Sequence, residues 1–356
     1  MAEPGHGVTR PRPPGTRPKV AFIGGAGTVG SSAAFRLATL DIASEIVLID
    51  ARPNLAMSHV MDLEQAVAEI SGSRIVGGDW ADLAGCDIVV LSASLPERNV
   101  ASRDEYLAGN LEIVRKAAEH LAACPEAVVV VATNPIDVFT HVLAQLAGGA
   151  PSRFVGYSYN DTLRFRWALA RTLGVAMADV DALVLGEHGD MQVPLFDLVS
   201  VKGEPAGLTE QQRREVEAAT RTWFSTYQSL NAGRTSGWTS AMGIGRLVAA
   251  MVGGASSSNG AATAGDAPAV AAAGAGTAGD PARAAATVGG LLPCSAILQG
   301  EYGLSGVSLG VPVVLGPGGV RQIVELPLTR VERSQLHAAA DKVRGLIDRA
   351  SSLLAS

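Results

Sequence analysis

A histidine flanked by glycines and acids stands in Gly186-Glu187-His188-Gly189-Asp190, 27 residues after Asp161. Asp161 begins an Asp-x-x-Arg pair that ends at Arg164. An imidazole can exchange the proton of a hydroxyl group, a neighbouring carboxylate can orient the ring and raise its pKa, and a guanidinium can bind a substrate carboxylate through two parallel hydrogen bonds. These three residues could therefore support redox chemistry on a 2-oxo acid. The alternative for His188 is a buried structural histidine bonded to a carbonyl.

Redox chemistry also needs a hydride carrier, and a glycine motif near the N-terminus predicts its site. Gly25-x-Gly27-x-x-Gly30 follows a predicted strand and opens a predicted helix, where glycines let backbone amides approach a pyrophosphate. Asp50 closes the next predicted strand, 20 residues after Gly30. An acid there can accept both ribose hydroxyls and would repel a 2′-phosphate, which favours NAD over NADP. A tight turn is the alternative for the glycine motif alone.

Composition excludes several other classes of protein. An apolar content of 47%, with 17% charged residues, is typical of a soluble globular chain. The net charge of -6 argues against nucleic acid as the main partner and favours a small molecule. The three cysteines, Cys86, Cys124 and Cys294, follow neither a disulfide nor a zinc pattern, so we expect no metal and a cytoplasmic location. The apolar runs are far shorter than the ~20 residues that cross a bilayer, so no membrane partner is expected.

The pattern of apolar residues predicts how these motifs are positioned. Short apolar runs alternate with amphipathic stretches, which indicates a doubly wound parallel sheet of the Rossmann type. Predicted strands cover residues 20–23, 46–49, 88–91 and 128–132, and predicted crossover helices cover residues 31–40, 107–123 and 136–147. We expect a disordered, proline-rich tail over residues 1–18 and an NAD-binding domain over residues 19–157.

Residues 158–356 are expected to form a substrate-binding and catalytic domain. Its predicted elements are a helix at 162–173, a strand-rich segment at 184–201, a helix at 209–230, another ending near residue 251, and a final helix at 330–354. Residues 253–290 interrupt this pattern, because they consist almost entirely of Ala, Gly, Ser, Thr, Asp and Pro. Such a segment buries too little apolar surface to offset its ordering entropy, so it is predicted to be a flexible insertion.

These residues resemble the lactate and malate dehydrogenase family, from about residue 19 to the C terminus, with only the insertion unmatched. Six stretches look like family signatures in the family's order: Gly25-Ala26-Gly27-Thr28-Val29-Gly30, Thr133-Asn134-Pro135-Ile136-Asp137-Val138, Gly186-Glu187-His188-Gly189-Asp190, Leu292-Pro293-Cys294-Ser295-Ala296, Gly300-Glu301-Tyr302-Gly303 and Leu309-Gly310-Val311-Pro312-Val313-Val314-Leu315-Gly316. The resemblance implies an α/β fold in which a Rossmann domain precedes the α+β C-terminal domain of this family.

The resemblance also implies a role for each matching residue. His188 would donate and accept the proton, Asp161 would be its carboxylate partner, and Arg164 would bind the C1 carboxylate of the substrate. Asn134 would bind the substrate oxygen beside the nicotinamide. The expected NAD-binding residues are Gly25, Gly27, Thr28, Val29, Gly30, Asp50, Ser92, Ala93, Asn110, Ala132 and Asn134.

A mobile lid is implied by Ser102-Arg103-Asp104, with Asn110 on the following helix. Arg103 would polarise the substrate carbonyl when the lid excludes water, although without the family an ordinary surface charge would be preferred. Six positions earlier the family places a discriminating side chain, arginine for malate and commonly glutamine for lactate, and here it is Glu97. Glu97 would repel the second carboxylate of malate, unless Arg98 replaces it through a shift of one residue.

The approach to Asp161 also departs from the family, which normally has Gly-Thr-x-Leu where this chain has Tyr157-Ser158-Tyr159-Asn160. This predicts a bulkier and more polar pocket wall. Asn160 could act with a Ser/Thr cluster that includes Ser240 to hydrogen bond a polar substituent on C3 of the substrate. The equally weighted alternative is neutral change with compensating repacking.

The expected function is NAD-dependent, reversible interconversion of malate and oxaloacetate by a homodimer or homotetramer. The alternatives are an L-lactate dehydrogenase and a reductase of another anionic 3-substituted pyruvate such as phosphonopyruvate, which Glu97 beside Arg98 suggests. A hypothesis of another class is a non-catalytic dinucleotide-binding sensor. The presence of His188, Asp161, Arg164 and Arg103 together argues against such a sensor.

Overall fold

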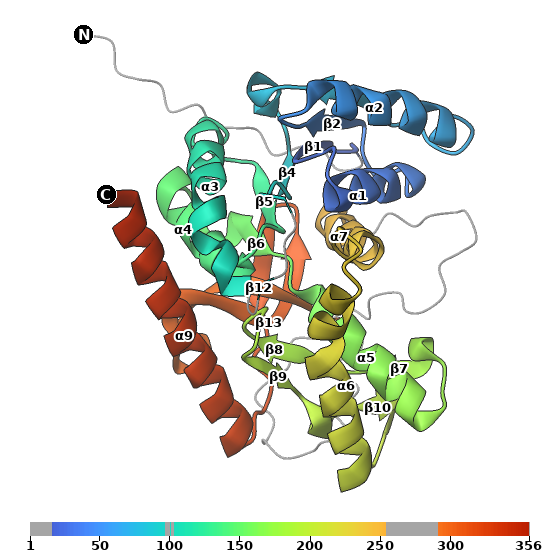
Figure 1. Cartoon of the computed structure of the whole chain (residues 1–356), viewed down its shortest axis with the longest axis vertical. Helices are drawn as coiled ribbons and strands as arrows, with labels where there is room; N and C mark the ends of the chain where they lie inside the picture. The colour runs from blue at the N-terminus through green and yellow to red at the C-terminus, as the bar shows by residue number, and fades with distance from the viewer. Residues whose placement is uncertain (1–15, 97–99, 101–102, 254–290, 356) are drawn as a thin grey trace.

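The computed structural model describes residues 16–96, 100, 103–253 and 291–355 (Figure 1). Of the tail expected at residues 1–18, all but the last three residues lie outside this part of the chain, as do residues 254–290 of the expected insertion. Across the described residues, no helix is both long enough and apolar enough to cross a membrane.

The first half of the chain forms a parallel sheet in the order β3-β2-β1-β4-β5-β6. Its strands are β1 (Lys19–Ile23), β2 (Glu45–Ile49), β3 (Arg74–Gly78), β4 (Ile88–Leu91), β5 (Val128–Val131) and β6 (Phe154–Gly156). The connecting helices are α1 (Thr28–Thr39), α2 (Pro53–Val67), α3 (Leu107–Leu121) and α4 (Ile136–Ala147), with short 3-10 turns η1 (Trp80–Leu83), η2 (Arg103–Tyr106) and η3 (Pro151–Arg153). The central strands β4 and β5 are buried at every position, as expected for strands covered by helices on both faces. The predicted doubly wound fold is confirmed.

The second half extends the same sheet with antiparallel strands. Ser295 of β12 pairs with Gly156 of β6, and the order continues through β13, β8 and β9, with β14 paired to β13. These strands are β8 (Val184–Gly186), β9 (Gln192–Pro194), β12 (Leu292–Gln299), β13 (Ser305–Gly316) and β14 (Gly319–Ile323), and a separate small sheet contains β7 (Val180–Asp181), β10 (Ser200–Val201) and β11 (Glu204–Pro205). The two halves are therefore joined by main-chain pairing, in addition to side-chain packing.

The described residues of the second half also form the longer helices α5 (Tyr159–Leu173), α6 (Glu210–Ser229), α7 (Gly237–Val252) and α9 (Arg330–Ala355), with 3-10 turns η4 (Met177–Asp179), η5 (Phe196–Leu198) and η6 (Glu301–Gly303). A capping box between Thr209 and Gln212 starts α6 where the sequence predicted a helix start. In Figure 1, α7 lies beside α1 of the first half, and α9 runs along the opposite edge of the molecule. The expected domain boundary at residues 157 and 158 falls between β6 and α5.

Two boundaries that matter for chemistry differ from the sequence prediction. Helix α1 begins at Thr28 instead of residue 31, so Gly30 lies inside its first turn. Helix α5 begins at Tyr159 instead of residue 162, so Asp161 and Arg164 share one helix and lie about one turn apart. Both helices begin about three residues earlier than predicted, because their first residues do not follow the helical spacing of apolar side chains on which the prediction depends.

Candidate active site

His188 and Asp161 are brought together by β8 and α5. Strand β8 ends at Gly186 and leads into the loop that carries His188, whose Nδ1 lies 2.6 Å from Oδ2 of Asp161. Both side chains are buried, with 5% and 4% exposed. When Nδ1–H donates this hydrogen bond, Nε2 is the ring nitrogen that can accept a proton. The expected pairing of these two residues is thus present as a close, desolvated contact.

A second carboxylate holds the backbone of the histidine. The amide of His188 donates a 2.6 Å hydrogen bond to Oδ2 of Asp137, which is the second residue of α4 and is fully buried. The pKa of Asp137 is raised from its ordinary value of 3.8 to about 7, mainly because the carboxyl is buried. The negative charges of Glu187 and Asp161 also raise this pKa, and the hydrogen bond from the His188 amide lowers it. In the sequence Asp137 is visible only as part of a family signature and has no predicted role, because no local spacing relates α4 to the His188 loop.

Arg164 is fixed between a carboxylate and an aromatic ring. Its Nη1 lies 3.3 Å from Oδ1 of Asp161, and its Cζ lies 4.0 Å from the centre of the Trp223 ring. The Trp223 ring in turn stacks on Tyr227, with ring centres 5.0 Å apart. A guanidinium stacked on an indole keeps its planar N–H groups directed along the plane, which suits recognition of a carboxylate. Trp223 comes from α6 and was not singled out from the sequence.

Asn160 and Ser240 also meet, as the polar-wall hypothesis requires. The Tyr157 hydroxyl donates a 2.6 Å hydrogen bond to Oδ1 of Asn160, and Nδ2 of Asn160 donates a 3.1 Å hydrogen bond to Oγ of Ser240. Ser240 donates in turn to the carbonyl of Ser236, and burial raises the pKa of Tyr157 well above its ordinary value. The amide of Asn160 is therefore bonded at both ends to protein groups, and the cluster ties α5 to α7.

The glycine motif forms a tight turn between β1 and α1. Gly24 has a φ of +85°, and a Cβ at Gly30 would lie 2.3 Å from the Gly24 carbonyl oxygen. At Gly25 a Cβ would lie 2.9 Å from Cα of Leu48 in β2. Gly24, Gly25 and Gly30 are therefore required for close packing, whereas a Cβ at Gly27 would meet only the Gly24 oxygen, at 3.3 Å. This leaves room beside Gly27, at the start of α1, for an anion.

Asp50 closes β2 beside this turn. Its Oδ2 accepts a 3.0 Å hydrogen bond from the Ala26 amide, and its Oδ1 accepts from the backbone amide of Arg52 at 3.0 Å. The Arg52 side chain, which is 62% exposed, also contacts Oδ1 at 3.2 Å. The carboxylate is thus held in place next to the glycine turn, where the sequence placed the adenosine ribose.

The expected nicotinamide end of the cofactor site is built at the carboxyl ends of β4 and β5. Asn110 accepts from the Leu95 amide at 2.8 Å and donates to the Asn134 carbonyl at 2.9 Å. Oδ1 of Asn134 is buried and has no hydrogen-bond partner among the described residues. Ser92, Ala93 and Ala132 lie directly after β4 and β5, as expected from their positions. A ligand group that donates to Asn134 would satisfy its buried oxygen, so these residues fit a dinucleotide.

Most of the expected lid lies outside the described part of the chain. Glu97, Arg98 and Ser102 lie outside the described residues. Arg103 begins η2, but its side chain is also outside the described part of the structure. The expected polarising arginine and the discriminating position therefore remain predictions from the sequence.

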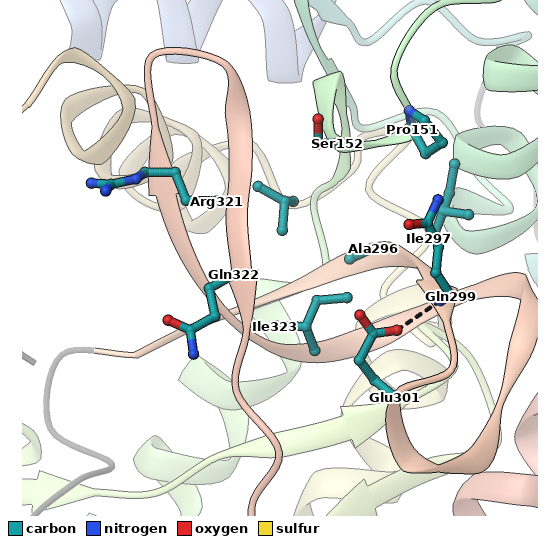
Figure 2. Close-up of a pocket in the computed structure, with 10 residues that line it drawn as sticks. Pro151, Ser152, Ala296, Ile297, Gln299, Glu301, Arg321, Gln322 and Ile323 are labelled. Carbon is teal, nitrogen blue, oxygen red and sulfur yellow. Dashed lines mark hydrogen bonds between the residues drawn. The ribbon is translucent and has the colours of Figure 1, made fainter. Parts of the chain in front are cut away.

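A separate cavity of about 260 Å³ lies away from these residues, on β12, β14 and η3 (Figure 2). Arg321, Gln322 and Ile323 of β14 line it on one side, and residues of β12 and η3 line the other. Glu301 at its rim accepts a 2.7 Å hydrogen bond from the Gln299 amide, drawn as the dashed line in Figure 2. None of the candidate catalytic residues lines this cavity.

Both halves of the chain match the two domains of one known protein family. Residues 18–156 match the model of the lactate/malate dehydrogenase NAD binding domain, and residues 160–228 and 254–353 match that of the lactate/malate dehydrogenase alpha/beta C-terminal domain. A malate dehydrogenase of Nostoc punctiforme is 37% identical over 95% of this chain and 95% of its own length. One from Halobacterium salinarum is 32% identical over 93% of this chain and 98% of its own.

Solved structures of the same kind are also similar. The lactate dehydrogenase of Cryptosporidium parvum, complexed with lactic acid and β-nicotinamide adenine dinucleotide, is 28% identical with a TM-score of 0.81, covering 94% of this chain and 98% of that one. The malate dehydrogenase of Salinibacter ruber is 28% identical with a TM-score of 0.78, at the same coverage. The resemblance inferred from the sequence signatures is confirmed.

Proposed function

The chain belongs to the lactate/malate dehydrogenase family, and from this we infer that it is an NAD-dependent 2-hydroxy acid dehydrogenase of the malate type. The reaction interconverts malate and oxaloacetate. The main structural support is the 2.6 Å contact between Nδ1 of His188 and Oδ2 of Asp161. Asp161 lies on the same helix as Arg164, α5. This arrangement supports an active proton carrier beside a carboxylate-binding group.

In the direction of malate oxidation, we propose that Nε2 of His188 accepts the proton of the C2 hydroxyl group. Asp161 stabilises the imidazolium that forms and keeps the proton on Nδ1. NAD, when bound, supplies the hydride acceptor. Because Asp161 is buried beside His188, its charge is poorly screened and acts strongly on the ring. In oxaloacetate reduction the same imidazolium returns the proton to the developing alkoxide.

Arg164 would bind the C1 carboxylate, and Arg103 would polarise the C2 carbonyl once the lid is closed. The Trp223 ring and the Asp161 carboxylate support Arg164 from two sides, so its position does not depend on substrate. The buried oxygen of Asn134 supports its role beside the nicotinamide. These roles require that substrate lie between His188 and Arg164, with C2 next to the imidazole.

A homodimer or homotetramer is proposed on the basis of exposed apolar side chains. Met57 and Met61 on α2 and Trp238 and Met242 on α7 are 50%, 59%, 67% and 53% exposed. Figure 1 places these two helices on either side of α1. Exposed apolar surface of this kind marks protein interfaces. Sedimentation velocity should give a mass of at least two chains, and Met61→Lys should lower it; a monomeric wild type would contradict the proposal.

A cytoplasmic location is proposed from the state of the cysteines. Cys86, Cys124 and Cys294 are free thiols. Burial raises the pKa of Cys86 to about 12, so this group stays protonated and unreactive at neutral pH. Thiols of this kind are compatible with a reducing compartment.

The function is tested by a substrate panel with NADH. Oxaloacetate, pyruvate and phosphonopyruvate are compared by kcat/KM, and oxaloacetate is expected to be preferred. His188→Asn, which retains a polar side chain of similar reach, is expected to lose turnover while still binding NADH in calorimetry. A preference for pyruvate or phosphonopyruvate would reject the malate assignment in favour of that substrate. NADH binding without turnover on any of the three would indicate a dinucleotide sensor.

A further inference from the structure

Lys342, on the C-terminal helix, reaches the loop that carries His188. Its Nζ lies 2.7 Å from Oε1 of Glu187 and 3.8 Å from Oδ2 of Asp190. In Figure 1, α9 runs past β8 and β9, the strands on either side of this loop, and it packs against both. A cation from the far end of the chain therefore contacts the residue directly before His188.

Glu187 links this cation to the shape of the loop. Its Oε2 accepts a 3.0 Å hydrogen bond from the Met191 amide, while its own amide donates to the Met191 carbonyl at 3.2 Å. A Cβ at Gly189 would lie 2.5 Å from Oε1 of Glu187, so the glycine is what lets the carboxylate fold back across the loop. The Glu187 side chain is only 5% exposed, and Lys342 is 26% exposed. Glu187 therefore closes the loop on one side and binds α9 on the other.

The loop lies among several charges contributed by different elements. Asp137 comes from α4, and Asp161 and Arg164 come from α5. Glu187 and Asp190 belong to the loop itself, and Lys342 comes from α9. The carboxylate charges of Glu187 and Asp161 both act on Asp137. Negative charge in this cluster favours the protonated form of His188, and the cation of Lys342 opposes the contribution of Glu187.

We propose that Lys342 is a positioning residue for His188, acting through Glu187. It holds the loop against α9 and offsets the carboxylate charge next to the histidine, so that the imidazole is neutral and able to accept a proton when the hydroxy acid is oxidised. This inference rests on the proposed function, because it assumes that His188 carries the proton. It adds a residue 154 positions away in the sequence to the machinery of the same site.

The test is the pH dependence of kcat/KM for malate oxidation. In Lys342→Met, loss of the cation favours the protonated histidine, so the acidic limb moves to higher pH by about half a unit or more, and the basic limb of oxaloacetate reduction moves in the same direction. Lys342→Arg keeps the charge and should restore the wild-type profile. Arg344→Met, which removes a cation from the same helix that pairs with Asp341 at 2.9 Å, is the matched control and should leave the limbs in place.

A double-mutant cycle tests whether the effect passes through Glu187. Glu187→Gln alone should move the acidic limb of malate oxidation to lower pH, and adding Lys342→Met to it should produce a smaller shift than in the wild type. This arm remains informative if Lys342→Met alone fails to fold, because in the double variant the buried side chain at position 187 carries no charge that has lost its cation. Unmoved limbs in both Lys342→Met and Glu187→Gln, or equal shifts in Arg344→Met, would overturn the inference. Retained turnover in His188→Asn would instead overturn the proposed function.

Discussion

Asp137→Asn should change how the stability of the protein depends on pH. Asp137 is fully buried on α4, and burial raises its pKa to about 7. In the unfolded chain the same carboxyl has its ordinary value of 3.8. Between these values the folded protein holds a proton that the unfolded chain has released, so this group makes the free energy of unfolding fall as pH rises from about 4 to above 7.

The size of this effect follows from the interval between the two pKa values. Each unit corresponds to 1.36 kcal/mol, so the ionised Asp137 costs the folded state up to about 4 kcal/mol above pH 7. Asparagine cannot titrate and keeps an acceptor oxygen for the His188 amide, which lies 2.6 Å from Oδ2 of Asp137. The variant should therefore have a stability close to that of the wild type near pH 4.5 and should exceed it increasingly as pH rises toward 8.

Urea unfolding followed by tryptophan fluorescence, at half-unit steps from pH 4.5 to 8.5, measures this difference. Other carboxylates titrate in both proteins, so they largely cancel when the two free energies are subtracted. Gln65→Ala on the exposed face of α2 removes no titratable group, so as the control it should give a difference that does not depend on pH. If the curves of wild type and Asp137→Asn stay parallel across this range, the carboxyl is not a buried group that titrates near neutrality, and the reasoning is wrong.

Three further substitutions test the site. Arg164→Lys loses the bidentate geometry, so kcat/KM for malate should fall by roughly 10²- to 10³-fold in steady-state kinetics while the Kd of NADH stays unchanged. A loss below tenfold would contradict the role of Arg164 in binding the C1 carboxylate. Trp223→Leu removes the cation–π contact of 4.0 Å and should raise the KM for malate by about three- to thirtyfold, whereas an unchanged KM would show that the ring does not support Arg164. Tyr157→Phe leaves the buried oxygen of Asn160 without its donor and should cost about 1–3 kcal/mol of unfolding free energy; no loss would mean that this hydrogen bond is replaced.

The parts of the fold that the sequence predicts are those with a strong local signal. The strands of the parallel sheet are continuous apolar runs, and Gly25, Gly27 and Gly30 stand at a strand-to-helix turn whose close packing requires Gly25 and Gly30. The pairing of His188 with Asp161 was expected from residue types and the family signature together. Each of these predictions depends on residues that lie within about 30 positions of one another or on a sequence motif typical of the family.

The antiparallel continuation of the sheet had no such signal. Strand β12 approaches β6 closely because residue 156 is a glycine, where a Cβ would lie 2.5 Å from Cβ of Ser295. A glycine at the end of an apolar run is equally consistent with a turn, so the sequence alone indicated only two lobes. The close approach becomes visible when the partner strand, nearly 140 residues later, is placed beside it.

Asp137, Trp223 and Lys342 were missed for a related reason. Each belongs to a helix whose own periodicity explains it as an ordinary helical residue, and each acquires a partner through the way that helix packs against α5 or the His188 loop. The angle and register of packed helices depend on many weak contacts, which a single sequence does not specify. The contacts of Asp137, Trp223 and Lys342 with the site could therefore be found only from the folded chain.

The unusual wall before Asp161 shows how the structure weighs two interpretations that the sequence left open. A Cβ at residue 243 of α7 would lie 2.1 Å from the Tyr157 hydroxyl oxygen, so the bulk of Tyr157 is accommodated by Gly243. The polar groups are matched as well, because Tyr157 and Ser240 bond both ends of the Asn160 amide. This reciprocal fit favours compensating repacking over recognition of a polar group on C3, since a substrate would have to break buried hydrogen bonds to use Asn160. We therefore propose that discrimination at C3 depends on Glu97 and Arg98, which the family resemblance places in the lid; the substrate panel repeated on variants at these two positions tests this.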